Sequence, residues 1–74
     1  MDPLSAVQLR ILREAATPGG CRKFTAASAA RLRRLVLVED RIVRPHGGLL
    51  EGRVFATDAG REWLRKVDAN ADKT

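Results

Sequence analysis

Residues 42–56 read IVRPHGGLLEGRVFA, and this stretch decides the fold. Two short runs that contain β-branched and aromatic residues, 42–44 and 53–56, lie on either side of a loop with three glycines. Strand-forming runs separated by a glycine-bearing loop are typical of an antiparallel hairpin. The sequence therefore predicts a two-stranded hairpin in its second half.

The register of this hairpin depends on the loop. A tight turn at the glycine pair 47–48 would place Arg44 opposite Glu51 and Ile42 opposite Arg53. A longer loop that extends through Gly52 is an equal alternative. The pattern thus predicts the hairpin but leaves its register open.

Three helices are expected around the hairpin. Residues 5–8, Ser-Ala-Val-Gln, have the form of a capping box and start the first helix, which Thr-Pro-Gly-Gly at 17–20 ends. After a short strand at 21–24, Thr25 caps a second helix over roughly 26–40. Thr57 caps a third helix that ends near Val67. We expect one mostly α, α+β domain over residues 1–67 and a disordered tail at 68–74.

Basic residues are concentrated in the middle of the chain. The whole sequence has 14 Lys and Arg against 9 Asp and Glu, a formal net charge of +5. Segment 22–53 holds eight basic and three acidic residues, so it accounts for the whole excess. Seven of the eight are Arg, whose planar guanidinium suits phosphates and guanine edges. This distribution predicts a polyanion as partner.

The composition also excludes several classes of function. No run approaches the roughly 20 apolar residues of a membrane span, and the N-terminus does not resemble a signal peptide. With Cys21 as the single cysteine, a reducing cytoplasm is the expected compartment. One His and one Cys are too few for a zinc site, and no nucleophile–base pair is evident. We therefore expect no enzyme activity, no metal and no cofactor.

The second helix has two different faces. At helical spacing, one face carries apolar residues that we expect in the core: Ala29, Leu32, Leu35 and Val36. The opposite face carries Ala27, Ala30, Arg31 and Arg34, with Arg33 at its flank. Small side chains and arginines on one exposed face would let the helix approach a phosphate-lined groove closely.

Two segments of the sequence resemble corresponding segments of winged-helix regulators of the MarR and PadR type. Residues 38–45, VEDRIVRP, resemble the exit of a recognition helix into the first strand of the wing. Residues 57–64, TDAGREWL, resemble the phrase that follows the second strand. The chain departs from the family in three ways, the first of which is that the family's usual dimerisation helices are absent. Residues 17–24 leave too little room for a normal helix before the recognition helix, and Arg41 stands where a left-handed glycine is usual.

The resemblance implies a winged helix-turn-helix that binds double-stranded DNA, usually as a homodimeric repressor. The recognition helix is either 26–40 or begins near Arg31, with a stunted preceding helix at 25–30. The hairpin would be the wing. Carried over to this sequence, the DNA-contacting residues would be Arg22, Lys23, Ala27, Ala30, Arg31, Arg33, Arg34, Arg44, His46 and Arg53.

The rival interpretation is a protein-interaction module that does not read DNA sequence. Four leucines could form its apolar patch: Leu9, Leu12, Leu49 and Leu50. The adjacent Leu49 and Leu50 are unusual in a loop and have three possible roles. They could fold back on the domain, contact a protein partner, or act as a wedge in the minor groove.

Overall fold

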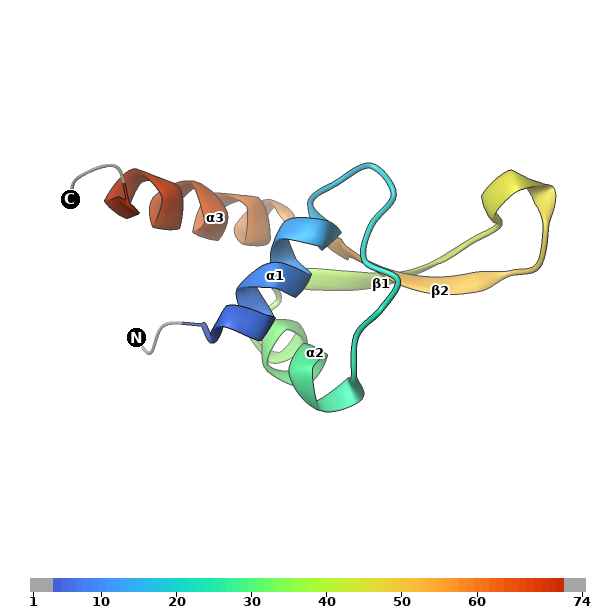
Figure 1. Cartoon of the computed structure of the whole chain (residues 1–74), viewed down its shortest axis with the longest axis horizontal. Coiled ribbons are helices and arrows are strands. Elements are labelled where there is room, and N and C mark those ends of the chain that lie inside the picture. The colour runs from blue at the N-terminus through green and yellow to red at the C-terminus, as the bar shows by residue number, and fades with distance from the viewer. Residues whose placement is uncertain (1–3, 72–74) are drawn as a thin grey trace.

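The computed structural model describes residues 4–71. The chain forms three helices and one antiparallel hairpin, in the predicted order and with the predicted mostly α, α+β class (Figure 1). The helices are α1 (Ala6–Ala15), α2 (Ala26–Arg34) and α3 (Asp58–Ala71), and the strands are β1 (Val38–Val43) and β2 (Glu51–Ala56), joined by a loop that contains the 3-10 turn η1 (Pro45–Gly47).

The predicted capping box starts α1. The Ser5 hydroxyl accepts a hydrogen bond from the Gln8 backbone N–H at 3.2 Å, and the Gln8 side chain accepts one from the Ser5 N–H at 2.9 Å. The helix then turns Ile11, Leu12 and Ala15 into the core. Leu12 is fully buried, so it takes no part in the exposed leucine patch that the rival interpretation required.

The second helix is shorter than predicted, because it ends at Arg34 and not at Asp40. The Leu37 N–H donates to the Leu32 carbonyl at 2.9 Å, and the Val36 N–H donates to the Arg33 carbonyl at 3.0 Å. This pair of bonds is a Schellman motif, in which the residue after the C-cap adopts a left-handed conformation. That residue is Val36, with φ of 58°, whereas Arg41, which stands where the family usually has a left-handed glycine, lies within β1.

The Schellman turn changes which residues of the apolar run 35–38 are buried and ends the helix before the run is complete. Val36, predicted in the core, is 64% exposed, while Leu37 and Val38 are buried. The chain leaves the turn directly in β1, so residues 38–40 are strand rather than helix. The segment between α1 and α2 contains no helix. The additional helix that usually precedes the recognition helix in the family is therefore missing, and α1 is followed directly by α2.

The hairpin has a longer loop than a tight glycine turn would give. β1 pairs with β2 so that Val43 lies opposite Glu51, Ile42 opposite Gly52 and Arg41 opposite Arg53. The register predicted from a tight turn was therefore displaced by one residue, and Arg44 lies in the loop rather than in the ladder. The loop comprises residues 44–50, so the longer-loop alternative was the closer one, although Gly52 itself lies within β2.

A single bridge ties the segment before α2 to the base of the hairpin. The Cys21 N–H donates to the Val54 carbonyl at 2.9 Å, and the Val54 N–H donates to the Cys21 carbonyl at 3.2 Å. The short strand predicted at 21–24 is thus reduced to this one pair. Both residues are fully buried against Leu12 and Leu32, which places the core where the two helices meet the base of the hairpin.

The N-terminal end of α3 packs tightly against the turn after α2. The Thr57 hydroxyl accepts from the Gly60 N–H at 3.1 Å, as a predicted N-cap should, and donates to the Val36 carbonyl at 2.7 Å. A Cβ on Gly60 would lie 2.1 Å from the Leu37 carbonyl oxygen. Only glycine permits this close approach of the two backbones.

The third helix continues beyond its predicted end at Val67. It includes residues 68–71, which we had expected in a disordered tail, whereas residues 72–74 lie outside the described part of the chain. Asp68 forms an ion pair with Arg13 of α1 at 2.8 Å, and this contact lowers the pKa of the Asp68 carboxyl.

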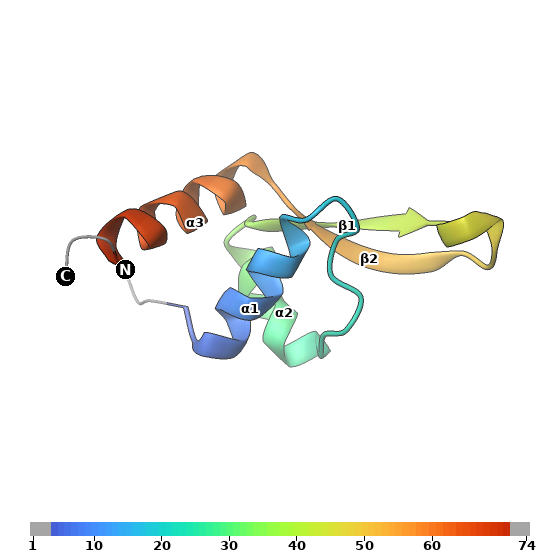
Figure 2. The ribbon, with the colours of Figure 1, turned by 45° about the horizontal axis from the view of Figure 1, so that its top comes forward.

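The molecule is elongated, with extents of 45 × 22 × 18 Å. The hairpin extends from one end and α3 from the other, with α1 and α2 crossed between them, as the two views in Figures 1 and 2 show. Within residues 4–71, no helix combines the length and the apolar character that a membrane crossing requires.

Candidate nucleic-acid interface

The exposed face of α2 is the first part of the candidate interface. Thr25 caps the helix by accepting the Ser28 N–H at 3.1 Å. Ala29 and Leu32 are buried, while Ala27, Ala30 and Arg34 are exposed and Arg31 is half-buried. The division into a core face and an outer face, predicted from helical spacing, is confirmed for these residues. No acidic residue occurs in α2, so its outer face carries only positive charge.

Half of the basic residues in segment 22–53 form ion pairs with acids of the same segment. The four pairs are Arg22–Glu51, Arg33–Asp40, Arg41–Glu39 and Arg53–Glu51. They engage all three acidic residues of the segment. Formal charge counted along the sequence therefore overstates how many of these side chains present an uncompensated charge.

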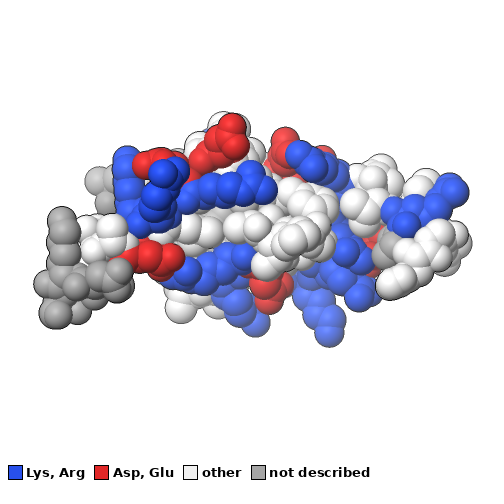
Figure 3. All heavy atoms as spheres, turned by 90° about the horizontal axis from the view of Figure 1, so that it is seen from above, with Lys and Arg blue, Asp and Glu red and all other residues white. Residues whose placement is uncertain are grey.

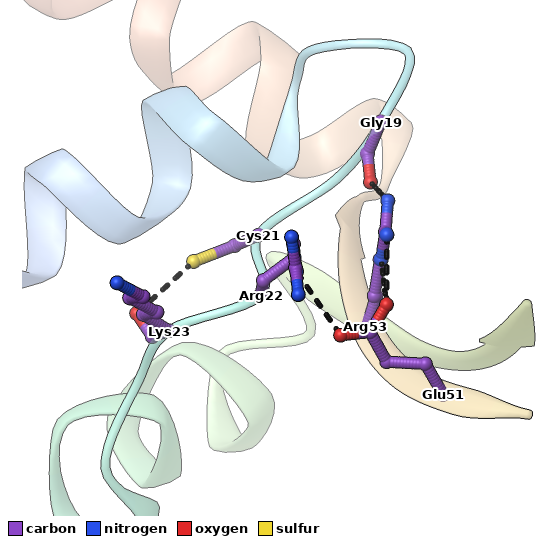
Figure 4. A network of polar contacts seen from close by, with 6 residues as sticks. All are labelled: Gly19, Cys21, Arg22, Lys23, Glu51 and Arg53. Carbon is purple, nitrogen blue, oxygen red and sulfur yellow. Dashed lines mark hydrogen bonds and ion pairs between the residues drawn. The ribbon is translucent and has the colours of Figure 1, made fainter. Parts of the chain in front are cut away.

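Arg53 and Arg22 hold the hairpin to the segment before α2 (Figure 4). The Arg53 guanidinium donates to Glu51 at 2.7 Å and to the Gly19 carbonyl at 2.8 Å, and its side chain is only 14% exposed. Arg22 donates to the other Glu51 oxygen at 3.0 Å. These two arginines lower the pKa of the Glu51 carboxyl. The structure thus gives Arg53 a role within the fold, although the resemblance implied a DNA contact.

Arg33 is also engaged within the domain. It donates to both carboxylate oxygens of Asp40, at 2.8 and 3.0 Å, and its guanidinium lies 5.6 Å from the centre of the Phe24 ring. This paired arrangement joins the end of α2 to β1. Arg33 lies at the flank of the outer face of α2, and its charge is largely compensated there.

Three predicted site residues, by contrast, form no ion pair within residues 4–71. Lys23, Arg34 and Arg44 are all exposed. They lie before α2, at its last position and in the hairpin loop respectively. Arg31 lies within α2, three residues before Arg34 on the same outer face. His46 is exposed in η1, further along the same loop.

The structure adds one basic residue that the sequence did not single out. Arg10 of α1 lines a shallow polar hollow of about 330 Å³ together with Glu14, Arg22 and Lys23. Arg10 and Glu14 are one helical turn apart and balance in a count of charges. However, the Glu14 carboxylate accepts a hydrogen bond from the Cys21 thiol at 3.2 Å, and within the described residues it forms no ion pair. Arg10 thus lies beside Lys23, but the Glu14 carboxylate in the same hollow keeps its negative charge, because a neutral thiol does not neutralise it.

Cys21 is a core residue rather than a reactive one. Burial, and then the hydrogen bond to Glu14, raise the pKa of its thiol to about 11. Since the thiolate is the reactive form, the group stays protonated and inert near neutral pH. No group of three or more His, Cys, Asp or Glu residues within 4–71 is placed to hold a metal ion.

Basic side chains are spread over the length of the molecule rather than gathered in one cluster. Figure 3 views the molecule from above Figure 1, the side away from α2, and shows Lys and Arg distributed from end to end with acidic groups among them. The uncompensated positive charge therefore lies at the basic side chains that have no acidic side chain beside them, and the positions of all basic residues do not show where it is. Within residues 4–71, Lys23, Arg34 and Arg44 are the residues that meet this condition on the α2 and hairpin side.

An apolar groove of about 630 Å³ lies on a different part of the surface, between α3, the start of α1 and the end of α2. Six apolar side chains supply most of its lining: Leu4, Leu9, Leu35, Leu37, Trp63 and Val67. Glu62 and Lys66 lie at its edge on α3. Trp63 and Val67 of α3 thus line an open groove and are only partly buried.

No family model, curated protein or solved structure matches the chain.

Proposed function

We propose that this domain binds double-stranded DNA and acts as a sequence-specific transcriptional regulator. The observation that carries the proposal is the outer face of α2, where Ala27 and Ala30 are exposed beside Arg31 and Arg34 and no acidic residue occurs. Alanines allow the helix backbone to approach a groove closely. Arginines can donate to phosphates or to the edge of guanine.

The dimensions of α2 support the same proposal. With its side chains an α-helix is about 10–12 Å across, which suits a major groove about 12 Å wide, and α2 offers nine residues to such a groove. Lys23 and Arg44 lie on either side of this helix in the chain and could contact the phosphates next to the groove. Phosphate contacts would orient the domain, and the side chains of α2 would read bases.

The direct test is selection of bound duplexes from a random pool, followed by affinity measurements as a function of salt. If about four basic side chains meet phosphates, log K should fall with log[salt] with a slope of about −3.6. Arg34→Ala should weaken binding to the selected duplex by about 1–3 kcal/mol if Arg34 contacts a base. An equal loss on selected and random duplexes would instead assign Arg34 to a phosphate.

Arg65→Ala is the matched control, because Arg65 is an exposed arginine on α3, away from the proposed interface. Both variants remove one positive charge from a helix. The proposal requires Arg34→Ala to have the larger effect on DNA affinity. Equal effects of the two variants, or a salt slope near zero for the wild-type domain, would contradict it.

A second candidate function, favoured by the apolar groove, is self-association. Ala59, Trp63 and Val67 follow one another at intervals of four residues along the groove side of α3. A second copy would bring the same apolar stripe, so two α3 helices could cover each other's grooves around a two-fold axis. Glu62 and Lys66, of opposite charge and one turn apart, could then pair across the interface.

A further inference from the structure

The tip of the hairpin exposes two consecutive leucines. Leu49 is 90% exposed and Leu50 is 64% exposed. Both lie in the loop of residues 44–50, at the end of the molecule opposite α3 (Figures 1 and 2). The structure thus contradicts the possibility that they fold back on the domain, and leaves these apolar side chains without a partner inside it.

The local backbone holds this tip away from the core. The ladder runs as far as the Val43–Glu51 pair, and η1 then turns the chain through left-handed conformations at His46 (φ 55°) and Gly47 (φ 72°). The Gly47 N–H donates to the Arg44 carbonyl at 3.3 Å. The Cys21–Val54 bridge fixes the base of the hairpin to the domain, so the two leucines lie at the end of a hairpin that is anchored at its base.

The charge around the tip has one sign. No acidic residue occurs from 41 to 50, whereas Arg44 and His46 lie in the loop next to the leucines. The nearest acid on the second strand is Glu51, which is already bound by Arg22 and Arg53. The tip therefore combines two apolar side chains with neighbouring basic residues. This combination is complementary to a polyanion that has an apolar interior.

The size of the apolar tip distinguishes among partners. A stable protein interface buries roughly 800 Å² on each side, to which two leucine side chains contribute only a small part. A lipid surface also fits poorly, because even a whole myristoyl chain gives only marginal membrane binding. A wedge between base pairs, by contrast, needs only one or two apolar side chains in the minor groove.

We infer that the hairpin tip inserts Leu49 and Leu50 into the minor groove and kinks the DNA, with Arg44 contacting a neighbouring phosphate. This inference rests on the proposed DNA binding and adds a deformation step to it. Specificity would then depend partly on base steps that unstack easily, at positions where the tip makes no hydrogen bond to a base.

The experiment uses the full chain and a duplex selected by the wild-type domain, with fluorophores at both ends and 2-aminopurine at successive positions. The wild-type domain should shorten the end-to-end distance and raise the 2-aminopurine fluorescence at one step. Leu49→Ala/Leu50→Ala should abolish both signals and weaken binding by about tenfold, while the salt slope stays unchanged because no charge is lost. Leu49→Met/Leu50→Met, which keeps the apolar volume, should retain the bend.

Ile42→Ala is the matched control, because Ile42 is also an apolar residue of the hairpin and 72% exposed, but lies in β1 rather than at the tip. It should leave the bend intact. Binding of the wild-type domain without any bend, or an unchanged bend in the double alanine variant, overturns the inference while the proposed DNA binding stands. If no duplex is bound at all, the proposed function itself fails.

Other partners of the tip are tested with the same double alanine variant. Loss of self-association, or of binding to anionic vesicles, with no effect on DNA binding would assign the tip to those partners and overturn the wedge.

Discussion

A single residue, Val36, carries backbone strain at the end of α2. Its φ of 58° is rare for a β-branched side chain, because Cβ crowds the following carbonyl oxygen in the left-handed region. The conformation is imposed by the Schellman bonds of Val36 and Leu37 on one side and by the Thr57 contact on the other. Val36 is 64% exposed, so its side chain gains little from burial in return.

We therefore predict that Val36→Gly stabilises the domain. Relief of the left-handed strain should raise the free energy of unfolding by about 1 kcal/mol, even though glycine makes the unfolded chain more flexible. Denaturation followed by circular dichroism measures the change. Val36→Ala keeps the Cβ and should give a smaller gain. A less stable glycine variant would mean that the exposed Val36 side chain contributes packing that outweighs the strain.

At the scale of elements, the sequence predicted the helices, the hairpin and the caps better than the boundaries between them. Caps at Ser5, Thr25 and Thr57 were recognisable because a side-chain oxygen must satisfy free N–H groups at each helix start. The end of α2 was not recognisable, since the apolar run after Arg34 fits a helix as well as a strand. No glycine marks the turn, because Val36 occupies the left-handed position.

The candidate interface was predictable to a similar extent. Helical spacing correctly placed Ala27, Ala30 and Arg34 on the outer face of α2, because that property depends only on the period of the helix. Which arginines are neutralised depends on contacts between elements, such as the ion pair of Arg22 with Glu51 of β2. Such contacts follow from the register of the hairpin, which the sequence left open.

The junction between α3 and the turn after α2 leads to a prediction at this scale. The Thr57 hydroxyl both caps α3 and donates to the Val36 carbonyl, so it joins two elements with one oxygen atom. Thr57→Val preserves the shape of the side chain but removes both bonds, and should lower the free energy of unfolding by about 1–2 kcal/mol. Thr57→Ser retains the hydroxyl and should lose much less. A larger loss in Thr57→Ser than in Thr57→Val would show that the methyl group, and not the hydroxyl, is what matters.

At the scale of the whole molecule, the surface proposed for DNA binding and the surface proposed for self-association lie on different parts of the domain. The hairpin and the outer face of α2 carry the surplus positive charge, whereas the apolar groove lies beside α3, which extends from the opposite end of the molecule (Figure 2). A 74-residue chain buries a smaller fraction of its surface than a larger domain does, so covering this groove would add stability that the core alone does not supply. Pairing through α3 would leave both hairpins free at the outside.

Self-association through α3 gives the last prediction. Val67→Glu places a charge in the apolar groove and should shift a dimer toward monomers, because the carboxylate would have to be buried without a partner. Ala69→Glu adds the same charge to an exposed position of the same helix and should leave the assembly unchanged. Sedimentation over a range of concentrations measures the equilibrium, and the emission of Trp63, the single tryptophan, should shift to longer wavelength as the groove is uncovered. A wild-type domain that stays monomeric at every concentration, or equal dissociation in the two variants, would contradict a two-fold pairing of α3. Because a dimer offers two copies of α2 to the DNA, Val67→Glu should then also weaken binding to a palindromic duplex more than binding to a single half-site.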